Sequence, residues 1–416
     1  MAERLQVPRG TYDVLPQDAD ARVALEATAR RILEGAGYRR IETPTFEHTE
    51  VFARGVGAST DIVQKEMYTF DDGGGRSVTL RPEGTAPICR AYAEHGMHKL
   101  PQPVKLWYLS SFFRSEKPQQ GRYRQFWQIG AEAIGSDDPA VDAELIVLLA
   151  TLLSELEVGG VRLRIGSLGT PATRAEYRLE LQAHLRTYVD KLSGEVRERI
   201  ELNPLRAFDT DHPGTREVMQ TAPLLLDRIS DDDKAHFAAV RGLLDRAGVD
   251  HEVDPTLVRG LDYYTRTVFE FTSDALGAQS GVAGGGRYDG LVEMLGGPPT
   301  PGCGWAAGIE RMLLASDGLP VAPAPVDLYV GFEADAQRAD AFALADEARR
   351  AGLNAQLELA GRSRKGQLKH ADRLGARYVA VVGDETTILK DMQAGEQREL
   401  AATAVVTRIL RERGMR

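Results

Sequence analysis

Hydrophobic and polar residues alternate with a period of two in a pair of neighbouring segments. Over residues 122–132 every second position carries a charged, amide or glycine residue or a lone phenylalanine, and the positions between them are mostly apolar. This period predicts a β-strand with one face on a core and the other face open. The open face would carry Arg122, Arg124, Phe126, Gln128, Gly130 and Glu132. Segment 105–116 has the same period and brings Arg114 and Glu116 to one side.

Two such strands side by side would present three arginines, an aromatic ring and two carboxylates on one surface. Guanidinium groups bind phosphate oxygens in a bidentate fashion, and a phenylalanine beside them can stack on a base. An ordinary sheet with a charged, solvated face is the alternative interpretation. The glutamines and the lone Phe126 among the charges favour a ligand site.

Similar patterns predict the other elements before residue 320. A period near 3.6 predicts helices, and strict alternation predicts strands. The predicted helices are 18–36, 139–156 and 288–295. The predicted strands are 38–45, 78–85, 162–166 and 259–272. Residues 170–250 are charge-rich and helical in pattern, and they predict a helical insertion between strands.

Glycine clusters at 284–286 and 302–308 match neither the GxxxxGK[ST] pattern of a P-loop nor the strand–helix context of a dinucleotide fingerprint. Close approach to a ligand or to another strand is the better interpretation. Arg311 follows the second cluster and is predicted to lie in the first turn of a helix, where the helix N-terminus and a guanidinium together favour an anion. A surface arginine is the alternative when this residue is considered by itself.

A proline-rich segment, 319–325, predicts a linker with a domain break near residue 322. Beyond it strands and helices alternate, which predicts a small α/β domain with a mostly parallel sheet. Its predicted strands are 326–332, 353–359, 378–382 and 387–390. Its predicted helices are 335–351, 365–374 and 400–413.

The length and composition of the chain indicate the general class of protein. A chain of 416 residues, 43% hydrophobic and 27% charged, predicts a soluble protein of two or three domains. We expect no secretory signal and no membrane span, because no apolar segment is long enough. The two cysteines, Cys89 and Cys303, stand outside any zinc or disulfide pattern and fit a reducing cytoplasm.

The net charge of −10 leaves room for a local basic patch that steers nucleic acid. Basic residues gather over 362–377, in a chain that is acidic elsewhere. The residues that we expect to face phosphates are Arg362, Arg364, Lys365 and Lys369. A solvated helix face is the alternative interpretation of the same cluster.

Taken together, these segments resemble the class II aminoacyl-tRNA synthetases and, among them, the histidyl-tRNA synthetase family. The class motifs are FRSE and RYRQF within 113–126 and AAGIERML at 306–313, with a looser pattern at 37–44. Histidine-specific segments are LRPEGT at 80–85 and LVRGLDYY at 257–264. Further segments that look like this family are PRGTYD at 8–13, GVG at 55–57 with DIV at 61–63, and NPLR at 203–206.

The resemblance implies an α+β fold, with an antiparallel sheet flanked by helices in a catalytic domain at 1–322, a helical insertion at about 170–250 and a C-terminal α/β anticodon-binding domain at 326–416. It implies a homodimer whose partners are L-histidine, ATP and the tRNA for histidine, with no membrane and no DNA. The implied reaction joins L-histidine to ATP, giving histidyl-adenylate and pyrophosphate, and then moves the histidyl group to the terminal ribose of the tRNA.

The resemblance also implies residue roles. The implied ATP-binding residues are Arg114, Glu116, Arg122, Phe126 and Arg311. The implied histidine-binding residues are Glu83, Thr85, Gln128, Glu132, Tyr263 and Tyr264. Arg259 and Arg114 are the implied catalytic residues at the α-phosphate, with Arg259 where other class II enzymes place a metal. No side chain is expected to bind a metal, and Mg²⁺ is expected on the phosphates of ATP. Arg287 and Tyr288 are expected to line the site.

Two alternatives stay open. Without Arg259 nearby in the sequence, Tyr263 and Tyr264 would be interpreted as a core aromatic pair. A non-catalytic relative, similar to the histidine-binding regulatory subunit of ATP phosphoribosyltransferase, would share much of the pattern. Such relatives typically lack the anticodon domain and have eroded motifs, whereas Arg114, Arg259 and Arg311 all stand in place here. The sequence therefore favours the enzyme.

Overall fold

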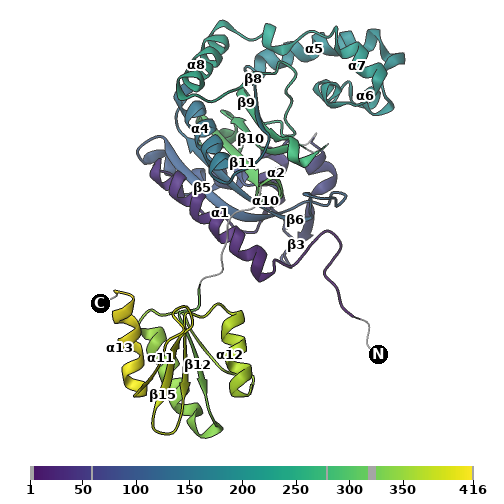
Figure 1. Ribbon diagram of the computed structural model, residues 1–416. Helices are drawn as coiled ribbons and strands as arrows, with labels where there is room; N and C mark the ends of the chain where they lie inside the picture. The colour runs from purple at the N-terminus through teal and green to yellow at the C-terminus, as the bar shows by residue number, and fades with distance from the viewer. Residues whose placement is uncertain (1–3, 58–59, 278–279, 317–324, 415–416) are drawn as a thin grey trace. The chain divides into compact units, whose positions relative to one another are not determined.

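An eight-stranded sheet forms the centre of the first of two units in the computed structural model, which describes residues 4–57, 60–277, 280–316 and 325–414. The strand order is β1-β5-β6-β11-β10-β9-β7-β8, antiparallel except for the parallel pair at each edge (Figure 1). The strands are β1 (Arg39–Arg40), β5 (Val104–Phe113), β6 (Gln125–Ile134), β7 (Val161–Ser167), β8 (Glu252–Val253), β9 (Thr265–Ser273), β10 (Gly281–Arg287) and β11 (Gly302–Gly308). The predicted antiparallel sheet is confirmed.

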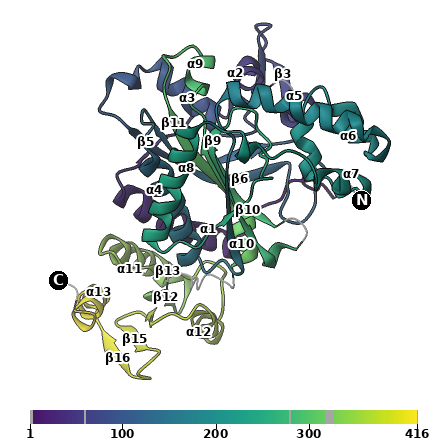
Figure 2. The ribbon, with the colours of Figure 1, turned by 90° about the horizontal axis from the view of Figure 1, so that it is seen from above.

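Three long helices cover one face of this sheet, as Figures 1 and 2 show: α1 (Pro16–Gly35), α4 (Pro139–Glu155) and α8 (Asp231–Ala247). Their buried aliphatic side chains share one core with inward-facing residues of the strands. Proline suits the first position of α4 because that position needs no N–H donor, and the carboxylate of Asp138 caps the helix by accepting from the amide of Ala140. The acidic first turn of α8 complements the helix dipole.

The opposite face carries the smaller elements and the predicted helical insertion up to residue 230, whereas α8, the last helix of the predicted segment 170–250, lies on the first face. A three-stranded sheet of order β2-β4-β3 consists of β2 (Phe46–His48), β3 (Tyr68–Asp71) and β4 (Ser77–Leu80). The other helices before the insertion are α2 (Thr49–Gly55), the π-helix η1 (Ile62–Glu66), α3 (Thr85–Glu94) and η2 (Met97–Lys99). The insertion contains α5 (Pro171–Thr187), η3 (Val189–Lys191), α6 (Gly194–Arg199), η4 (Pro204–Asp209), α7 (Pro213–Met219) and η5 (Leu225–Asp227). After β9 come η6 (Asp274–Leu276), α9 (Leu291–Met294) and α10 (Ile309–Ala315).

The insertion shares a hydrophobic core with this face of the sheet. Tyr177 and Leu181 of α5 belong to the same buried cluster as Tyr108 of β5 and Tyr264. The helices α5 to η5 of the insertion therefore pack onto the part of the sheet that carries the predicted site residues.

The predicted strand 259–272 is wrong in its first part. β9 begins only at Thr265, and the backbone turns sharply there, because Arg266 has a φ of +44° and the pairing with β10 shifts register nearby. Arg259 and the two tyrosines that follow it lie in the loop before β9, so alternation does not decide which way they point.

The predicted strand 78–85 is also too long. β4 ends at Leu80, and Thr85 is the first residue of α3. The carboxylate of Glu83 accepts hydrogen bonds from the amides of Thr85 (2.7 Å) and Ala86 (3.0 Å), which have no partner inside the helix. The glycine cluster at 302–308, in contrast, is a complete strand, β11, paired on both sides.

The second unit, Val321–Arg416, has a five-stranded sheet of order β13-β12-β14-β15-β16 within its described residues. Its elements are β12 (Leu328–Phe332), η7 (Asp335–Gln337), α11 (Arg338–Arg350), β13 (Ala355–Leu357), α12 (Arg364–Arg373), β14 (Tyr378–Val382), β15 (Thr387–Asp391), β16 (Gln397–Leu400) and α13 (Ala402–Glu412). The α/β prediction is confirmed, but only β12–β13 and β12–β14 are parallel, so the sheet is not mostly parallel. Residues 319–324 of the predicted linker lie outside the described residues.

Within the described ranges, none of the helices has both the length and the apolar character needed to cross a lipid bilayer.

Candidate active site

Two cavities of about 580 Å³ and about 520 Å³ adjoin each other in the first unit. Residues that line both include Arg114, Arg122, Gln128, Arg259, Glu270 and Gly284. We name the first the arginine cavity, because Arg311 joins the other arginines there. We name the second the tyrosine cavity, because Tyr108, Tyr263 and Tyr264 line it. The shared walls make them two ends of one space.

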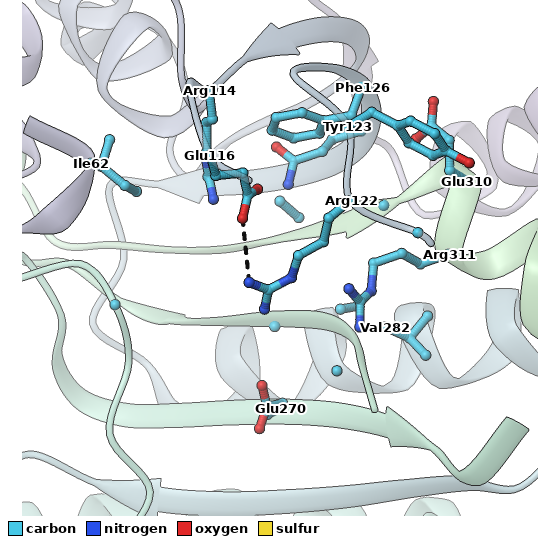
Figure 3. Close-up of a pocket in the computed structure, with 18 of the residues that line it drawn as sticks. Ile62, Arg114, Glu116, Arg122, Tyr123, Phe126, Glu270, Val282, Glu310 and Arg311 are labelled. Carbon is cyan, nitrogen blue, oxygen red and sulfur yellow. Dashed lines mark hydrogen bonds and ion pairs between the residues drawn. The ribbon is translucent and has the colours of Figure 1, made fainter. Parts of the chain in front are cut away.

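The loops at the ends of β5 and β6 hold the charged groups of the arginine cavity. Arg114 follows β5, and its Nε donates to the backbone oxygen of Pro82 at 2.9 Å. Its guanidinium lies 5.3 Å from the ring centroid of Phe126 in β6, so the arginine and the ring form a cation–π pair. Glu116 forms a 3.3 Å ion pair with Arg122, drawn as a dashed line in Figure 3.

Arg122 and Arg311 enter the arginine cavity next to each other, as Figure 3 shows. Burial, together with the positive charge of Arg122, lowers the pKa of Arg311. Two guanidinium groups held this close repel each other, and an anion between them removes that cost. The arrangement therefore favours a ligand that carries several negative charges.

Arg259 lies at the junction of the two cavities and is held in one place. Its Nη1 donates to Oε1 of Glu270 at 2.9 Å. Gly284 lies directly beneath the guanidinium: a Cβ added there would stand 2.2 Å from Nη2 of Arg259. Burial disfavours the charged form of Arg259, but the neighbouring Tyr264 and Glu270 outweigh it and raise its pKa.

Two buried acids lie at the tyrosine cavity: Glu83, just before α3, lines it, and Glu132 of β6 lies behind it. Glu83 is 4% exposed, and burial raises its pKa although two backbone amides and Arg114 stabilise its charge. Thr85 donates through Oγ1 to Oε1 of Glu132 at 2.8 Å, and the hydroxyl of Tyr288 donates to Oε2 of Glu132 at 2.6 Å. Glu132 has no exposed surface, and burial raises its pKa to about 8.

Aromatic side chains enclose the rest of the tyrosine cavity. The rings of Tyr263 and Tyr264 lie 4.8 Å apart between centroids, and the hydroxyl of Tyr263 donates to Glu83 at 3.5 Å. Burial raises the pKa of Tyr264 to about 12, so its hydroxyl stays protonated at neutral pH. Oε1 of Gln128 is buried without a hydrogen-bond partner in the described part of the chain. These groups suit a small ligand with its own donors and acceptors.

The structure brings the residues predicted from the sequence together, with one exception. Those predicted for ATP all line the arginine cavity: Arg114, Glu116, Arg122, Phe126 and Arg311. Those predicted for histidine that line the tyrosine cavity are Glu83, Thr85, Gln128, Tyr263 and Tyr264. Glu132 lines neither cavity and lies behind Thr85. Which ligand each residue holds stays a prediction.

Four side chains lie elsewhere than predicted. Tyr288, expected as lining, lines neither cavity and is buried with its hydroxyl on Glu132. Arg124 lines neither cavity, and its guanidinium instead donates to backbone oxygens of Arg9 and Glu116. Tyr123, assigned to the core face, lines the arginine cavity because β6 starts only at Gln125.

Arg287, expected as lining, is completely buried and paired with Asp142 at 2.9 Å and Asp289 at 3.1 Å. Its role in the described structure is to join the start of α4 to the end of β10.

Sequence reasoning missed several residues of this site, including Glu270, Tyr108 and Arg206. Tyr108 lies in an apolar run of β5, but its hydroxyl is buried without a partner in the described residues. Its ring packs directly against two glycines. A Cβ added at Gly130 would stand 2.3 Å from the ring, and a Cβ added at Gly84 would stand 2.7 Å from it. Arg206 comes from the insertion and lines both cavities. Gly130, which faces Tyr108 in the neighbouring strand, was the available signal, and Arg206 stands in the family-like segment NPLR at 203–206.

The basic cluster predicted to face phosphates lies in the second unit, at α12. Arg364, Lys365 and Lys369 are exposed, and Arg362 is half-buried. The completely buried carboxylate of Glu358 accepts from Arg362 at 3.2 Å. A fixed loop therefore precedes an exposed basic helix.

Among the described residues, no group of three or more histidine, cysteine, aspartate or glutamate side chains is placed to hold a metal ion. Glu116 and Glu270, two carboxylates of the arginine cavity, are each paired with an arginine.

Comparisons with known proteins cover both units. A family model described as histidyl-tRNA synthetase matches residues 10–312, and one described as anticodon binding domain matches residues 324–412. The histidine–tRNA ligase of Acetivibrio thermocellus is 44% identical over 413 residues, covering 97% of this chain and 99% of that protein. The histidine–tRNA ligase of Nocardia farcinica is 49% identical over 407 residues, covering 96% of each.

Solved structures agree with these matches. The apo histidyl-tRNA synthetase of S. aureus is similar with a TM-score of 0.81 and 36% identity, covering 98% of this chain and all of that one. A Bacillus halodurans C protein described as an ATP phosphoribosyltransferase regulatory subunit/histidyl-tRNA synthetase has a TM-score of 0.66 and 22% identity, covering 92% and 100%. At that identity the likeness shows a shared fold.

Proposed function

Since the chain belongs to the histidyl-tRNA synthetase family, we propose that it activates L-histidine with ATP and then transfers the histidyl group to its tRNA, with both substrates of the first step in the two joined cavities. The enzyme is an ATP-dependent histidine–tRNA ligase. One observation carries the assignment of the site: guanidinium groups from segments far apart in the chain converge on one space beside a polar, aromatic-lined cavity.

The first step needs charge neutralisation more than a protein nucleophile. The ionised carboxylate of histidine attacks the α-phosphorus of ATP, a new O–P bond forms, and the bond to the bridging oxygen breaks, releasing pyrophosphate. We assign Arg114 and Arg259 to the α-phosphate, where negative charge grows, and Arg122 and Arg311 to the leaving pyrophosphate. Groups fixed beforehand stabilise such charge without reorganising. The Glu270 ion pair and the backbone bond to Pro82 support this fixed placement for Arg259 and Arg114.

The base of ATP fits the open end of the arginine cavity. We assign adenine to the ring of Phe126, with Glu116 at its amino group. The cation–π pair between Arg114 and Phe126 supports this, since it holds the ring beside the arginine that meets the α-phosphate. Mg²⁺ would enter on the phosphates, because Glu116 and Glu270 already have arginine partners, and it would neutralise part of the triphosphate charge.

The tyrosine cavity fits histidine. A buried site that hydrogen-bonds the polar atoms of its ligand rejects analogues without them, because its own groups are then left unpaired. We assign the α-amino group to Glu83, Thr85 and Gln128, and the imidazole to Tyr264, with Tyr263 orienting Glu83. The unpaired oxygen of Gln128 supports this assignment. Glu132 lines neither cavity and already accepts from Thr85 and Tyr288, and its direct contact with imidazole stays a prediction.

We also propose that the second unit binds the anticodon region of the tRNA through the basic cluster at α12. The exposed Arg364, Lys365 and Lys369 and the match to an anticodon-binding family support it. The homodimer, the cytoplasmic location and the division into domains at 1–322 and 326–416 are parts of the same proposal, and family membership supports them.

The regulatory alternative is not favoured, because the curated relatives that match nearly the whole chain at 44–49% identity are histidine–tRNA ligases. Histidine-dependent exchange of labelled pyrophosphate into ATP tests the proposal directly. The unmodified protein should catalyse exchange, and Arg259→Ala should reduce it by about 100-fold or more. Absence of exchange in the unmodified protein would contradict the proposed function.

A further inference from the structure

Residues 8–13, which we name the N-terminal strap, contact the chain neighbours of two cavity arginines. The strap is the segment PRGTYD, and it precedes α1. On one side it meets the residues that follow Arg122, and on the other it meets the residue that precedes Arg311. The contacts assigned so far to ATP and histidine use none of the strap residues.

The first set of contacts fixes the loop that carries Arg122. The backbone oxygen of Gly10 accepts from the amide of Arg124 at 2.8 Å. The guanidinium of Arg124 also reaches the backbone oxygen of Arg9 at 3.4 Å. Next to it, the rings of Tyr12 and Tyr123 lie 4.5 Å apart between centroids. The two residues immediately after Arg122 are therefore both held by the strap.

The second set of contacts fixes Glu310, the residue before Arg311. The hydroxyl of Tyr12 donates to Oε1 of Glu310 at 2.6 Å, and Arg22 of α1 forms a 2.8 Å ion pair with the same oxygen. Burial and the hydrogen bond to Glu310 raise the pKa of Tyr12, so its hydroxyl is a proton donor at all working pH values.

Glu310 also joins the two strands that end at the arginine cavity. The pairing of β11 with β6 stops at Gly308, opposite Gln128. The carboxylate of Glu310 continues it, since both its oxygens accept from the amide of Trp127, at 3.2 and 3.1 Å. Figure 3 shows Glu310 close to Tyr123, with Arg122 and Arg311 pointing into the space beside them.

We propose that the N-terminal strap is a positioning element for the triphosphate end of ATP, which sets the spacing of Arg122 and Arg311 through Tyr123, Arg124 and Glu310. Because these two arginines repel each other in the absence of a ligand, their spacing must be held by neighbours rather than by mutual attraction. The inference rests on the proposed function, since it takes the anion in this cavity to be ATP.

The strap has one position where a small change prevents docking. Gly10 has a φ of +88°, and a Cβ there would stand 2.8 Å from Pro118 and 2.9 Å from Arg124. Gly73 is a matched control, because its φ of +76° carries a similar backbone cost but a Cβ there meets nothing within 4 Å. Comparing alanine at both positions separates backbone strain from loss of docking.

The test compares Tyr12→Phe and Gly10→Ala with Gly73→Ala and with Tyr188→Phe, a change at an exposed tyrosine that follows α5. Tyr12→Phe keeps the ring against Tyr123 and removes only the hydroxyl. The expected result is a rise of about five- to tenfold in the KM for ATP in pyrophosphate exchange, with the KM for histidine unchanged. The calorimetric Kd of a non-hydrolysable ATP analogue should rise by the same factor, and amide exchange at Arg124 should accelerate in Gly10→Ala. Both controls should match the unmodified protein.

Two results would overturn the inference. In an active protein, unchanged KM and Kd for the nucleotide in both strap variants would show that the strap does not set the site. An equal rise in the KM values for ATP and histidine would show a general structural role. If the unmodified chain shows no exchange, the proposed function fails by itself, and the nucleotide Kd still decides the role of the strap.

Discussion

Gly284→Ala should displace the guanidinium of Arg259, which we assign to the α-phosphate, while leaving the fold intact. Gly284 lies in the middle of β10, opposite Glu270 on one side and Ala306 on the other. Its backbone conformation is open to alanine, since its φ lies outside the left-handed region. The new Cβ would stand 2.2, 2.6 and 2.8 Å from Nη2, Cζ and Nη1 of Arg259.

The size of the displacement follows from these distances. An ordinary contact starts at 3.4 Å, so Nη2 of Arg259 has to move by about 1.2 Å from its 2.2 Å position. The displacement weakens the ion pair of Arg259 with Glu270, and this cost is offset in part because alanine is favoured over glycine in a strand by roughly 0.5–1 kcal/mol. Stability should therefore change little. A misplacement of about 1 Å in a catalytic group costs roughly 100-fold, or about 2.7 kcal/mol of transition-state stabilisation.

The assay is histidine-dependent pyrophosphate exchange on Gly284→Ala, Arg259→Ala, the double variant and the control Gly194→Ala, whose Cβ would meet nothing within 4 Å. We expect kcat to fall about 100-fold in Gly284→Ala, with the midpoint of thermal unfolding nearly unchanged. The double variant should be no slower than Arg259→Ala, because both changes act through one guanidinium. A kcat within twofold of the unmodified enzyme, or full additivity in the double variant, would refute the reasoning.

Two further predictions concern stability and tRNA. The pKa of Glu132 is about 8 in the folded protein and 4.5 in its ordinary state. The folded state therefore favours the protonated carboxyl, which contributes a few kcal/mol of stability. This contribution is complete below pH 4.5 and is lost as the pH rises through 8. Glu132→Gln should flatten the fall in unfolding free energy between pH 5 and 9, measured by urea denaturation at each pH; an unchanged slope would contradict this origin. Replacing Arg364 and Lys365 by glutamate should raise the KM for tRNA at least tenfold at about 0.15 M salt and leave pyrophosphate exchange intact, and impaired exchange would contradict a role confined to tRNA.

Local alternation was enough to predict the residues of β6. Phe126 and Gln128 face the cavity because side chains in a strand alternate, and no distant contact can change that without breaking the pairing with β5. The prediction failed for Arg124, which lies just before the first residue of β6. Arg124 is two residues before Phe126 and therefore matches the alternation of the strand. Its amide nevertheless donates to the backbone oxygen of Gly10, more than a hundred residues earlier in the chain.

The start of α3 shows a signal that was present and missed. Glu83 and Thr85 are two residues apart, as expected for side chains on one face of a strand. Pro87, two residues later, has no N–H to donate to a neighbouring strand and is typical of the first turn of a helix. The strand β16 carried no such signal. Its residues are exposed and polar, so the hairpin with β15 depends on pairing that hydrophobic periodicity cannot reveal.

Other residues of the site depend on contacts between distant parts of the chain. The placement of Arg206 depends on how the insertion packs against the sheet, and the unpaired hydroxyl of Tyr108 depends on glycines in β6 and before α3. Family resemblance supplied the role of Arg259, which composition and spacing leave as one arginine among many, and it decided between the anion site and the surface position that the sequence allows for Arg311. The sequence therefore predicted which strand faces carry the site residues, and the structure showed the two joined cavities that these faces enclose.

The arginines of the site differ in how firmly they are held, and the difference follows the proposed chemistry. Glu270 accepts from both Arg259 (2.9 Å) and Arg164 (2.6 Å), and Gly284 beneath leaves Arg259 one place to lie. The pair of Arg122 with Glu116 is longer, at 3.3 Å, and the arginine is 41% exposed, so solvent weakens it. A fixed guanidinium suits the α-phosphate, where stabilisation counts only if no reorganisation is needed in the transition state. An adjustable one suits the pyrophosphate, which has to leave.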